Sequence, residues 1–299
     1  MMKRRQILAA VLFTWFSLVI SFGLAQAEET GKSFTWEIET VGGKSYILGS
    51  VHALKKEHYP LKQAIERAFT NSTVLVVEAN ISEGKIMEAA ELAMKKGSYG
   101  ENETLKDNLS EKTYNLAKQR LLEKGLDIDN FSKIKPWMLA LTITSMEIMQ
   151  LGFDPNYGID KYFMDRAAGK KEILELEGAA FQVNLLDGLS PDESDKFLFI
   201  TLQETEDYQA ELDKMVAAWK NGDAEMMERL VNKSMQDLPG MEGLFKKMND
   251  DRNVQMLDKI LTFFKEKKSC LIVVGAAHLV GEKGLLQMLK NKGFILKQL

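Results

Sequence analysis

Two of the chain's three histidines occupy the same four-residue frame, Gly-x-x-His, near opposite ends of the sequence. One frame ends at His52 and the other at His278, and a short apolar run precedes each, at residues 46–48 and 271–274. A strand, a glycine turn, a histidine and a helix are how many α/β proteins place a reactive side chain at the carboxyl end of a sheet. We therefore expect both imidazoles to face one cleft. The alternative is two unrelated strand-ending turns whose histidines are ordinary polar residues.

The first 27 residues have the pattern of a bacterial secretory signal peptide. Residues 3–5 are basic, residues 7–24 are mostly apolar, and residues 25–27 form an A-x-A cleavage signal. An uncleaved N-terminal anchor is the alternative, because the apolar run is long for a signal peptide. We expect an exported protein, periplasmic or secreted, whose residues 28–299 form a single domain.

Charge and cysteine content exclude several classes of protein. Removing the signal segment leaves 36 of the 39 Lys and Arg residues against 43 Asp and Glu residues, a net charge of about −7. Nucleic acid is not an expected partner, since its binding requires a basic face. The sequence after the signal segment contains no second run of about 18 apolar residues, so we expect no membrane span after signal cleavage. Cys270 is the only cysteine and is expected to be a buried, inert thiol, so any metal site must use histidine and carboxylate ligands.

Apolar periodicity predicts an α/β fold with a small central sheet from the N- and C-terminal segments and a long helical insertion, about residues 84–265. Strands are expected at residues 33–39, 46–49, 74–77, 172–176, 271–274 and 294–296. Helices are expected at residues 60–69, 84–96, 110–124, 136–151, 159–168 and 285–289, with residues 191–265 helical as well.

Four polar residues stand where a predicted strand gives way to a turn. They are His52, Glu78, Glu177 and His278. Because the carboxyl ends of strands in an open α/β sheet converge on a crevice, we expect these side chains to lie together. Two histidines with one or two carboxylates match the ligands of a hydrolytic site for zinc, manganese or cobalt. Such an ion polarises a carbonyl and activates water, and a remaining glutamate would act as general base.

Several of these candidates also have an ordinary structural interpretation. Glu78 follows four apolar residues, so a buried ion pair is the alternative there. Glu177 lies in a generally acidic stretch. Arg252 and Asn253 open a predicted helix, where Arg252 is a candidate partner for a carboxylate and Asn253 a candidate helix cap. His58, in a polar stretch, is expected at the surface.

These motifs resemble those of the TraB/PrgY/GumN family, and most of all its bacterial GumN-like branch. Residues 48–52 (LGSVH) and 274–281 (VGAAHLVG) resemble the family's paired GxxH motifs, and residues 76–78 resemble its strand-end glutamate. Further similarities occur in the family's order at residues 135–138, 158–160, 176–177, 181–182, 187–189 and 251–253. The resemblance extends from about residue 34 to residue 294, and the shared order of short motifs makes it specific.

The resemblance implies a metal-dependent activity. The animal Tiki proteins are similar metal-dependent proteases that need the GxxH histidines and a glutamate, and erythromycin-esterase-like hydrolases and haem-binding ChaN-like lipoproteins have related folds. Carried over to this chain, His52, His278 and Glu78 form the core of the site and hold a divalent manganese, cobalt or zinc ion. The supporting residues implied are Glu177, Arg252 and Asn253.

The expected function is an exported metal-dependent hydrolase, a peptidase, with the substrate itself left open. Glu177 or a nearby carboxylate would accept a proton from the attacking water, and Arg252 would stabilise the developing oxyanion. Two other functions fit the pattern. One is a haem- or metal-binding envelope protein without turnover, since histidine is a haem ligand. The other is a non-catalytic binding module that uses the helical insertion.

Overall fold

The centre of the fold is a mixed sheet of six strands in the computed structural model, which describes residues 31–203, 208–236, 242–266 and 268–299. In sheet order the strands are β4 (Glu172–Glu175), β3 (Val74–Val77), β5 (Cys270–Gly275), β2 (Gly43–Ser50), β1 (Thr35–Thr40) and β6 (Leu296–Gln298). The four strands from β4 to β2 are parallel, and β1 pairs antiparallel with both β2 and β6. The expected signal peptide, residues 1–27, lies outside the described residues.

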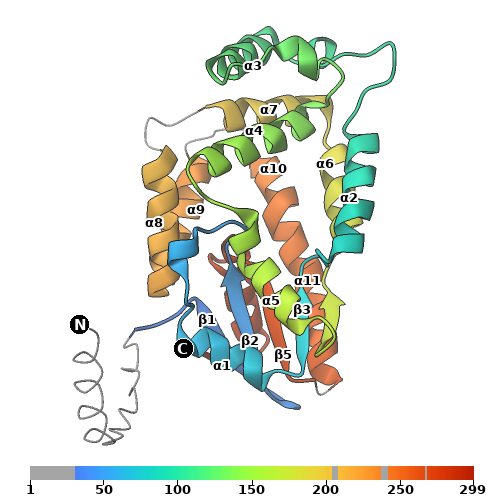
Figure 1. The fold of residues 1–299 in the computed structure, drawn as a ribbon. Helices are drawn as coiled ribbons and strands as arrows, with labels where there is room; N and C mark the ends of the chain where they lie inside the picture. The colour runs from blue at the N-terminus through green and yellow to red at the C-terminus, as the bar shows by residue number, and fades with distance from the viewer. Residues whose placement is uncertain (1–30, 204–207, 237–241, 267) are drawn as a thin grey trace, which may run out of the picture. The chain divides into compact units, whose positions relative to one another are not determined.

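Helices occupy the connections from β2 to β3, β3 to β4, β4 to β5 and β5 to β6, and most of them lie between β3 and β5 (Figure 1). Their bounds are α1 (Gln63–Asn71), α2 (Glu83–Lys96), α3 (Glu111–Glu123), α4 (Pro136–Gln150), α5 (Ile159–Ala167), α6 (Ala179–Asp187), α7 (Pro191–Leu202), α8 (Tyr208–Asn221), α9 (Ala224–Gln236), α10 (Glu242–Phe245), α11 (Asp251–Lys265), α12 (Ala276–Leu279) and α13 (Leu285–Asn291). Short 3-10 turns are η1 (Lys56–His58), η2 (Lys106–Asn108), η3 (Ile128–Phe131) and η4 (Pro155–Tyr157), and η5 (Lys246–Asp250) is a π-helical turn.

Apolar sequence explains the central position of β3 and β5. Both strands consist almost entirely of buried aliphatic residues, as a parallel strand must when helices cover the sheet. Figure 1 shows α1 and α5 crossing in front of the sheet. α11 adds Met256, Leu257, Ile260 and Phe264 to the same core, a spacing of three and four residues that defines one helix face.

Part of the helical insertion has a second core of its own. α3, α4 and α7 lie together at one end of Figure 1, and their buried residues form a cluster separate from the sheet. Its members include Ala117, Leu121, Leu139, Ile143 and Leu198. Among the described residues, no helix has the length and apolar composition needed to cross a membrane.

The α/β class is confirmed, and the differences from expectation are local. The strand expected at residues 172–176 is present as β4, and because it pairs parallel with β3, the sheet includes a strand from within the insertion as well as from the two ends of the chain. No helix was expected at α6. The last strand lies at residues 296–298 rather than 294–296, since the Phe294 ring packs against Phe264 at a centroid distance of 5.4 Å before the strand begins. Cys270 is buried as expected, and burial raises the pKa of its thiol to about 11.

Candidate functional site

The register of the parallel strands brings their carboxyl ends to one edge of the sheet. Ser50 of β2 lies beside Gly275 of β5, and Val77 of β3 lies beside Val273 of β5 and Glu175 of β4. The residues that follow these strands therefore emerge at neighbouring positions. The structure brings together all six side chains named from the sequence, which are His52, Glu78, Glu177, Arg252, Asn253 and His278.

Three of these side chains, from His52, Glu78 and His278, surround the space that a side chain at Gly275 would occupy. A β-carbon built on Gly275 would lie 3.3 Å from Glu78 Oε1, 3.5 Å from His278 Cδ2 and 3.6 Å from His52 Nε2. We call these three side chains the GxxH cluster. The other frame glycine has a packing role, because a β-carbon on Gly49 would lie 2.4 Å from the Phe34 ring.

His52 is paired with a carboxylate that sequence reasoning did not assign to the site. Its Nδ1 lies 2.7 Å from Asp160 Oδ2, while 69% of its side chain is exposed. Attraction to Asp160 outweighs desolvation and raises the pKa of His52 to about 9. Burial alone would raise the pKa of Asp160, but the neighbouring imidazolium and its hydrogen bond lower it on balance. His52 is therefore protonated at neutral pH, with Nε2 directed to the cluster.

Gly158 explains how Asp160 reaches His52. A β-carbon on Gly158 would lie only 2.2 Å from the carbonyl oxygen of His52, so only glycine permits this approach. The backbone N–H of Ile159 donates to the Val51 carbonyl at 3.1 Å, which fixes the start of α5 against the loop after β2. The available signal was the Gly158-Ile159-Asp160 motif, which the sequence offered only as a family similarity.

His278 has a different hydrogen-bond partner from His52, and its ring is neutral rather than protonated. Its Nδ1 lies 2.7 Å from Asn253 Oδ1, and the Asn253 amide donates to the Lys283 carbonyl at 2.9 Å. Because that bond orients the amide, Nδ1 carries the imidazole proton and Nε2 keeps its lone pair. Burial lowers the pKa of His278 to about 4, so the ring is neutral at pH 7. Asn253 lies inside α11 and does not cap it.

Arg252 joins the two glutamates. Its Nε donates to Glu177 Oε1 at 2.7 Å, and its Nη2 donates to Glu177 Oε2 and to Glu78 Oε2, both at 2.7 Å. Its Nη1 donates to the Met248 carbonyl at 3.0 Å. Gln182, which the sequence offered only as part of a family similarity at residues 181–182, donates to Glu78 at 3.3 Å and to Glu177 at 3.2 Å. Burial opposes the charge on Arg252, but these bonds raise its pKa on balance.

Glu78 thus lies between the arginine and the histidines. Its Oε1 accepts the Gly275 N–H at 2.5 Å and stands 4.0 Å from His278 Nε2, whereas its Oε2 faces Arg252. The structural ion pair considered from the sequence is present, and it leaves Oε1 on the side of the imidazoles.

The donor set of the GxxH cluster suits a divalent metal. Each imidazole keeps Nε2 toward the cluster while a second residue holds Nδ1, the arrangement in which proteins orient metal-binding histidines. Across the part of the chain that is described, no three His, Cys, Asp or Glu side chains already stand where they could hold an ion together. Since ligands of one ion lie roughly 3 Å apart, Glu78 and His278 would have to approach each other by about 1 Å.

His58 lies apart from these contacts. Its Nδ1 accepts the Lys55 N–H at 2.9 Å, and its ring lies 6.1 Å from that of Phe153. It is half-buried at the surface, where this backbone bond and ring contact hold it against the chain.

The comparisons with known proteins agree with the motif order. The profile of the TraB/PrgY/gumN family matches residues 34–298. Two proteins named "Uncharacterized protein YbaP", from Shigella flexneri and from Escherichia coli K12, are each 26% identical over 265 residues, which cover 87% of this chain and 94% of theirs. No solved structure matches the chain. The chain belongs to the TraB/PrgY/gumN family.

Proposed function

We propose that this chain is an exported, metal-dependent hydrolase that cleaves peptides. The observation that carries the proposal is the GxxH cluster, in which His52, Glu78 and His278 converge around Gly275. The two imidazoles come from opposite ends of the chain, and Asp160 and Asn253 orient them so that both contribute Nε2. Two histidines whose pKa values are shifted in opposite directions, gathered with a carboxylate around one point, have the character of a functional site.

In this proposal the three cluster residues hold the ion. A divalent metal bound there would polarise the scissile carbonyl and activate a water molecule. Electrostatics support a cation at this point, because Glu78, Glu177 and Asp160 outnumber the one permanent positive charge of Arg252. With His52 deprotonated, these residues carry a net charge of −2, which a divalent ion would neutralise.

Arg252 and Glu177 act mainly as positioning residues. Both oxygens of Glu177 accept bonds from Arg252, and its side chain is 2% exposed, which favours holding the arginine over proton transfer. The described contacts use all but one of the five N–H groups of Arg252, and the remaining N–H is on Nη1. The oxyanion role proposed for Arg252 depends on that single donor.

Calorimetric titration tests the metal site directly. Purified protein is titrated with Mn²⁺, Co²⁺ and Zn²⁺, beside the double variant His52→Ala/His278→Ala and the control His58→Ala, which removes the chain's third histidine. We expect stoichiometric binding in the wild type and the control and its loss in the double variant. Cleavage of a mixed peptide library by the loaded protein then tests hydrolysis.

The opposite results would refute the proposal. A folded wild type that binds none of the three ions contradicts the metal site. Binding that the double variant retains, or that His58→Ala removes, contradicts its location. A Soret band on haem addition that His52→Ala or His278→Ala abolishes would instead support the haem-binding alternative.

A further inference from the structure

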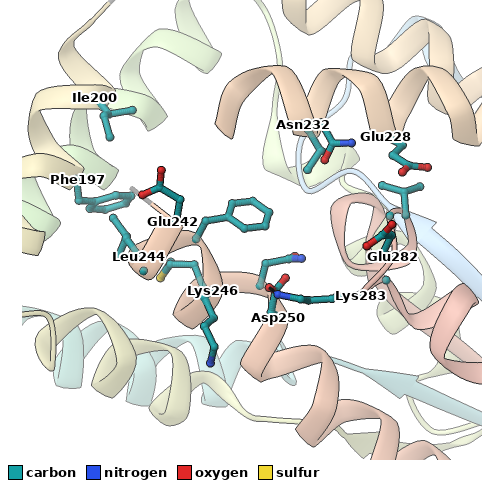
Figure 2. Close-up of a pocket in the computed structure, with 18 residues that line it drawn as sticks. Phe197, Ile200, Glu228, Asn232, Glu242, Leu244, Lys246, Asp250, Glu282 and Lys283 are labelled. Atoms are coloured by element: carbon teal, nitrogen blue, oxygen red, sulfur yellow. Dashed lines mark hydrogen bonds and ion pairs between the residues drawn. The ribbon is translucent and has the colours of Figure 1, made fainter. Parts of the chain in front are cut away.

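A large, mostly apolar pocket adjoins the residues that support the GxxH cluster. It has a volume of about 810 Å³ and is lined by parts of α7, α9, α10, η5 and the segment after α12. Figure 2 shows Phe197, Ile200 and Leu244 grouped at one side of it, with Asp250 and Lys283 toward the other. We call it the helical pocket. Its size and apolar lining are those of small-molecule and side-chain binding sites in proteins.

Two backbone carbonyls connect the helical pocket to the cluster. Met248 and Lys283 both line the pocket. The Met248 carbonyl accepts a bond from Arg252 at 3.0 Å, and the Lys283 carbonyl accepts a bond from Asn253 at 2.9 Å. A molecule in the pocket would therefore contact the same backbone segments that position Arg252 and Asn253.

Asn249 supplies a polar group within this apolar surface. It lines the pocket, is 8% exposed, and its side chain has no hydrogen-bond partner among the residues that the structure describes. Its amide atoms are not among the fully buried side-chain atoms that lack a partner, so they remain accessible and a ligand in the pocket can hydrogen-bond to them. It lies in the π-helical turn η5, a conformation that occurs frequently at functional sites. A carboxamide offers both a donor and an acceptor, which matches a peptide group.

The charges around the pocket disfavour an anionic ligand. Lys283 is paired with Asp250 at 2.8 Å, and Lys246 is paired with Asp251. The acidic residues Glu228 and Glu282 also line the pocket. Because both lysines are already engaged and carboxylates remain, a fatty acid or a phosphate would find no available cation and would be repelled. A neutral group with an apolar side chain and an amide fits better.

We infer that the helical pocket binds a large apolar side chain of a peptide, with the neighbouring peptide group hydrogen-bonded to Asn249. The helical pocket is then the site that selects the substrate of the proposed hydrolase, and in this respect the inference rests on the proposed function. Binding in the pocket itself does not require a metal or any reaction.

The first probe is N-acetyl-L-phenylalaninamide, which has an apolar side chain between two amides. The second is decanoate, a fatty acid anion that has an apolar chain and no amide. Binding is measured by calorimetry and by protein-observed NMR on the wild type and on three single variants. Ile200→Trp fills the apolar side of the pocket, and Asn249→Leu removes the carboxamide at similar volume. Ile86→Trp makes the same type of change on α2, where Ile86 is 46% exposed and outside the pocket. Near-ultraviolet circular dichroism confirms that each variant is folded.

We expect the amide probe to bind the wild type and Ile86→Trp equally. Asn249→Leu should weaken its binding about tenfold through loss of the amide hydrogen bonds, and Ile200→Trp should weaken it by at least about tenfold. The double variant His52→Ala/His278→Ala should bind it as the wild type does. If the protein cleaves peptides, Ile200→Trp should raise KM for substrates with a large apolar residue more than for those with alanine.

Three results would overturn the inference. They are absence of amide-probe binding to the wild type, binding of the amide probe by both pocket variants as tightly as by the wild type, and tighter binding of decanoate than of the amide probe. Failure of the proposed function can be distinguished from failure of this inference. Probe binding without hydrolysis under any metal retains the pocket and refutes the hydrolase, whereas hydrolysis that the pocket variants leave unchanged retains the hydrolase and refutes the pocket.

Discussion

Metal binding at the GxxH cluster should release close to one proton at neutral pH, because the two histidines differ in charge. His52, with its pKa raised to about 9, is almost fully protonated at pH 7.5, whereas His278, with its pKa lowered to about 4, is neutral. An imidazole must be unprotonated at Nε2 to bind a metal, so the ion displaces a proton from His52 and none from His278. Release should fall to about half a proton at pH 9, and apparent affinity should rise about tenfold per pH unit below that value.

Calorimetry in buffers of different ionisation enthalpy counts these protons, since the observed enthalpy changes linearly with the number released. The matched variant is Asp160→Asn, which removes the charge that raises the pKa of His52. With the pKa of His52 at or below about 6.5, release at pH 7.5 should drop to roughly 0.1 proton or less. The difference of about 0.9 proton isolates His52 from any other ionisation linked to binding. Equal proton release by the wild type and Asp160→Asn would refute the assigned charge states.

Three further predictions concern stability, each followed by urea denaturation. Gly158→Ala places a β-carbon 2.2 Å from the His52 carbonyl and should destabilise the fold by about 1–3 kcal/mol, whereas Gly84→Ala, in open space, should have little effect. Arg252→Ala leaves two buried carboxylates without their partner and should cost about 3–5 kcal/mol; a loss below about 1 kcal/mol would contradict the described ion pairs. Because the unfolded state takes up a proton near pH 6.5 that native His278 does not, the metal-free protein should lose about 2–3 kcal/mol between pH 7 and 4.5 relative to His278→Gln.

The sequence was informative wherever a local pattern determined the outcome. Continuous aliphatic runs identified β3 and β5 because a central parallel strand is buried on both faces. A polar residue directly after such a strand must emerge at the carboxyl edge, which is why His52, Glu78 and His278 could be named together. The sheet order then determined which of these side chains became neighbours.

Contacts between distant segments could not be read in the same way. Asp160 reaches His52 across 108 residues because Gly158 allows two backbone segments to touch, and neither spacing nor periodicity records such an approach. Gln182 lies on α6, a helix whose residues carry no clear amphipathic pattern. The helical pocket depends on a π-helical turn, and a single extra residue per turn leaves no distinctive mark on a sequence.

The two GxxH frames are alike in sequence and differ in chemistry because of what lies behind each ring. A carboxylate behind His52 stabilises the imidazolium in an exposed position, while a carboxamide behind the buried His278 accepts a hydrogen bond from the neutral ring. At such a site His278 can bind a metal ion directly, whereas His52 must first lose its proton. An incoming cation therefore replaces the positive charge of the proton that it displaces from His52. The motif alone therefore does not define the site; the identity of Asp160 and Asn253 determines how each histidine can act.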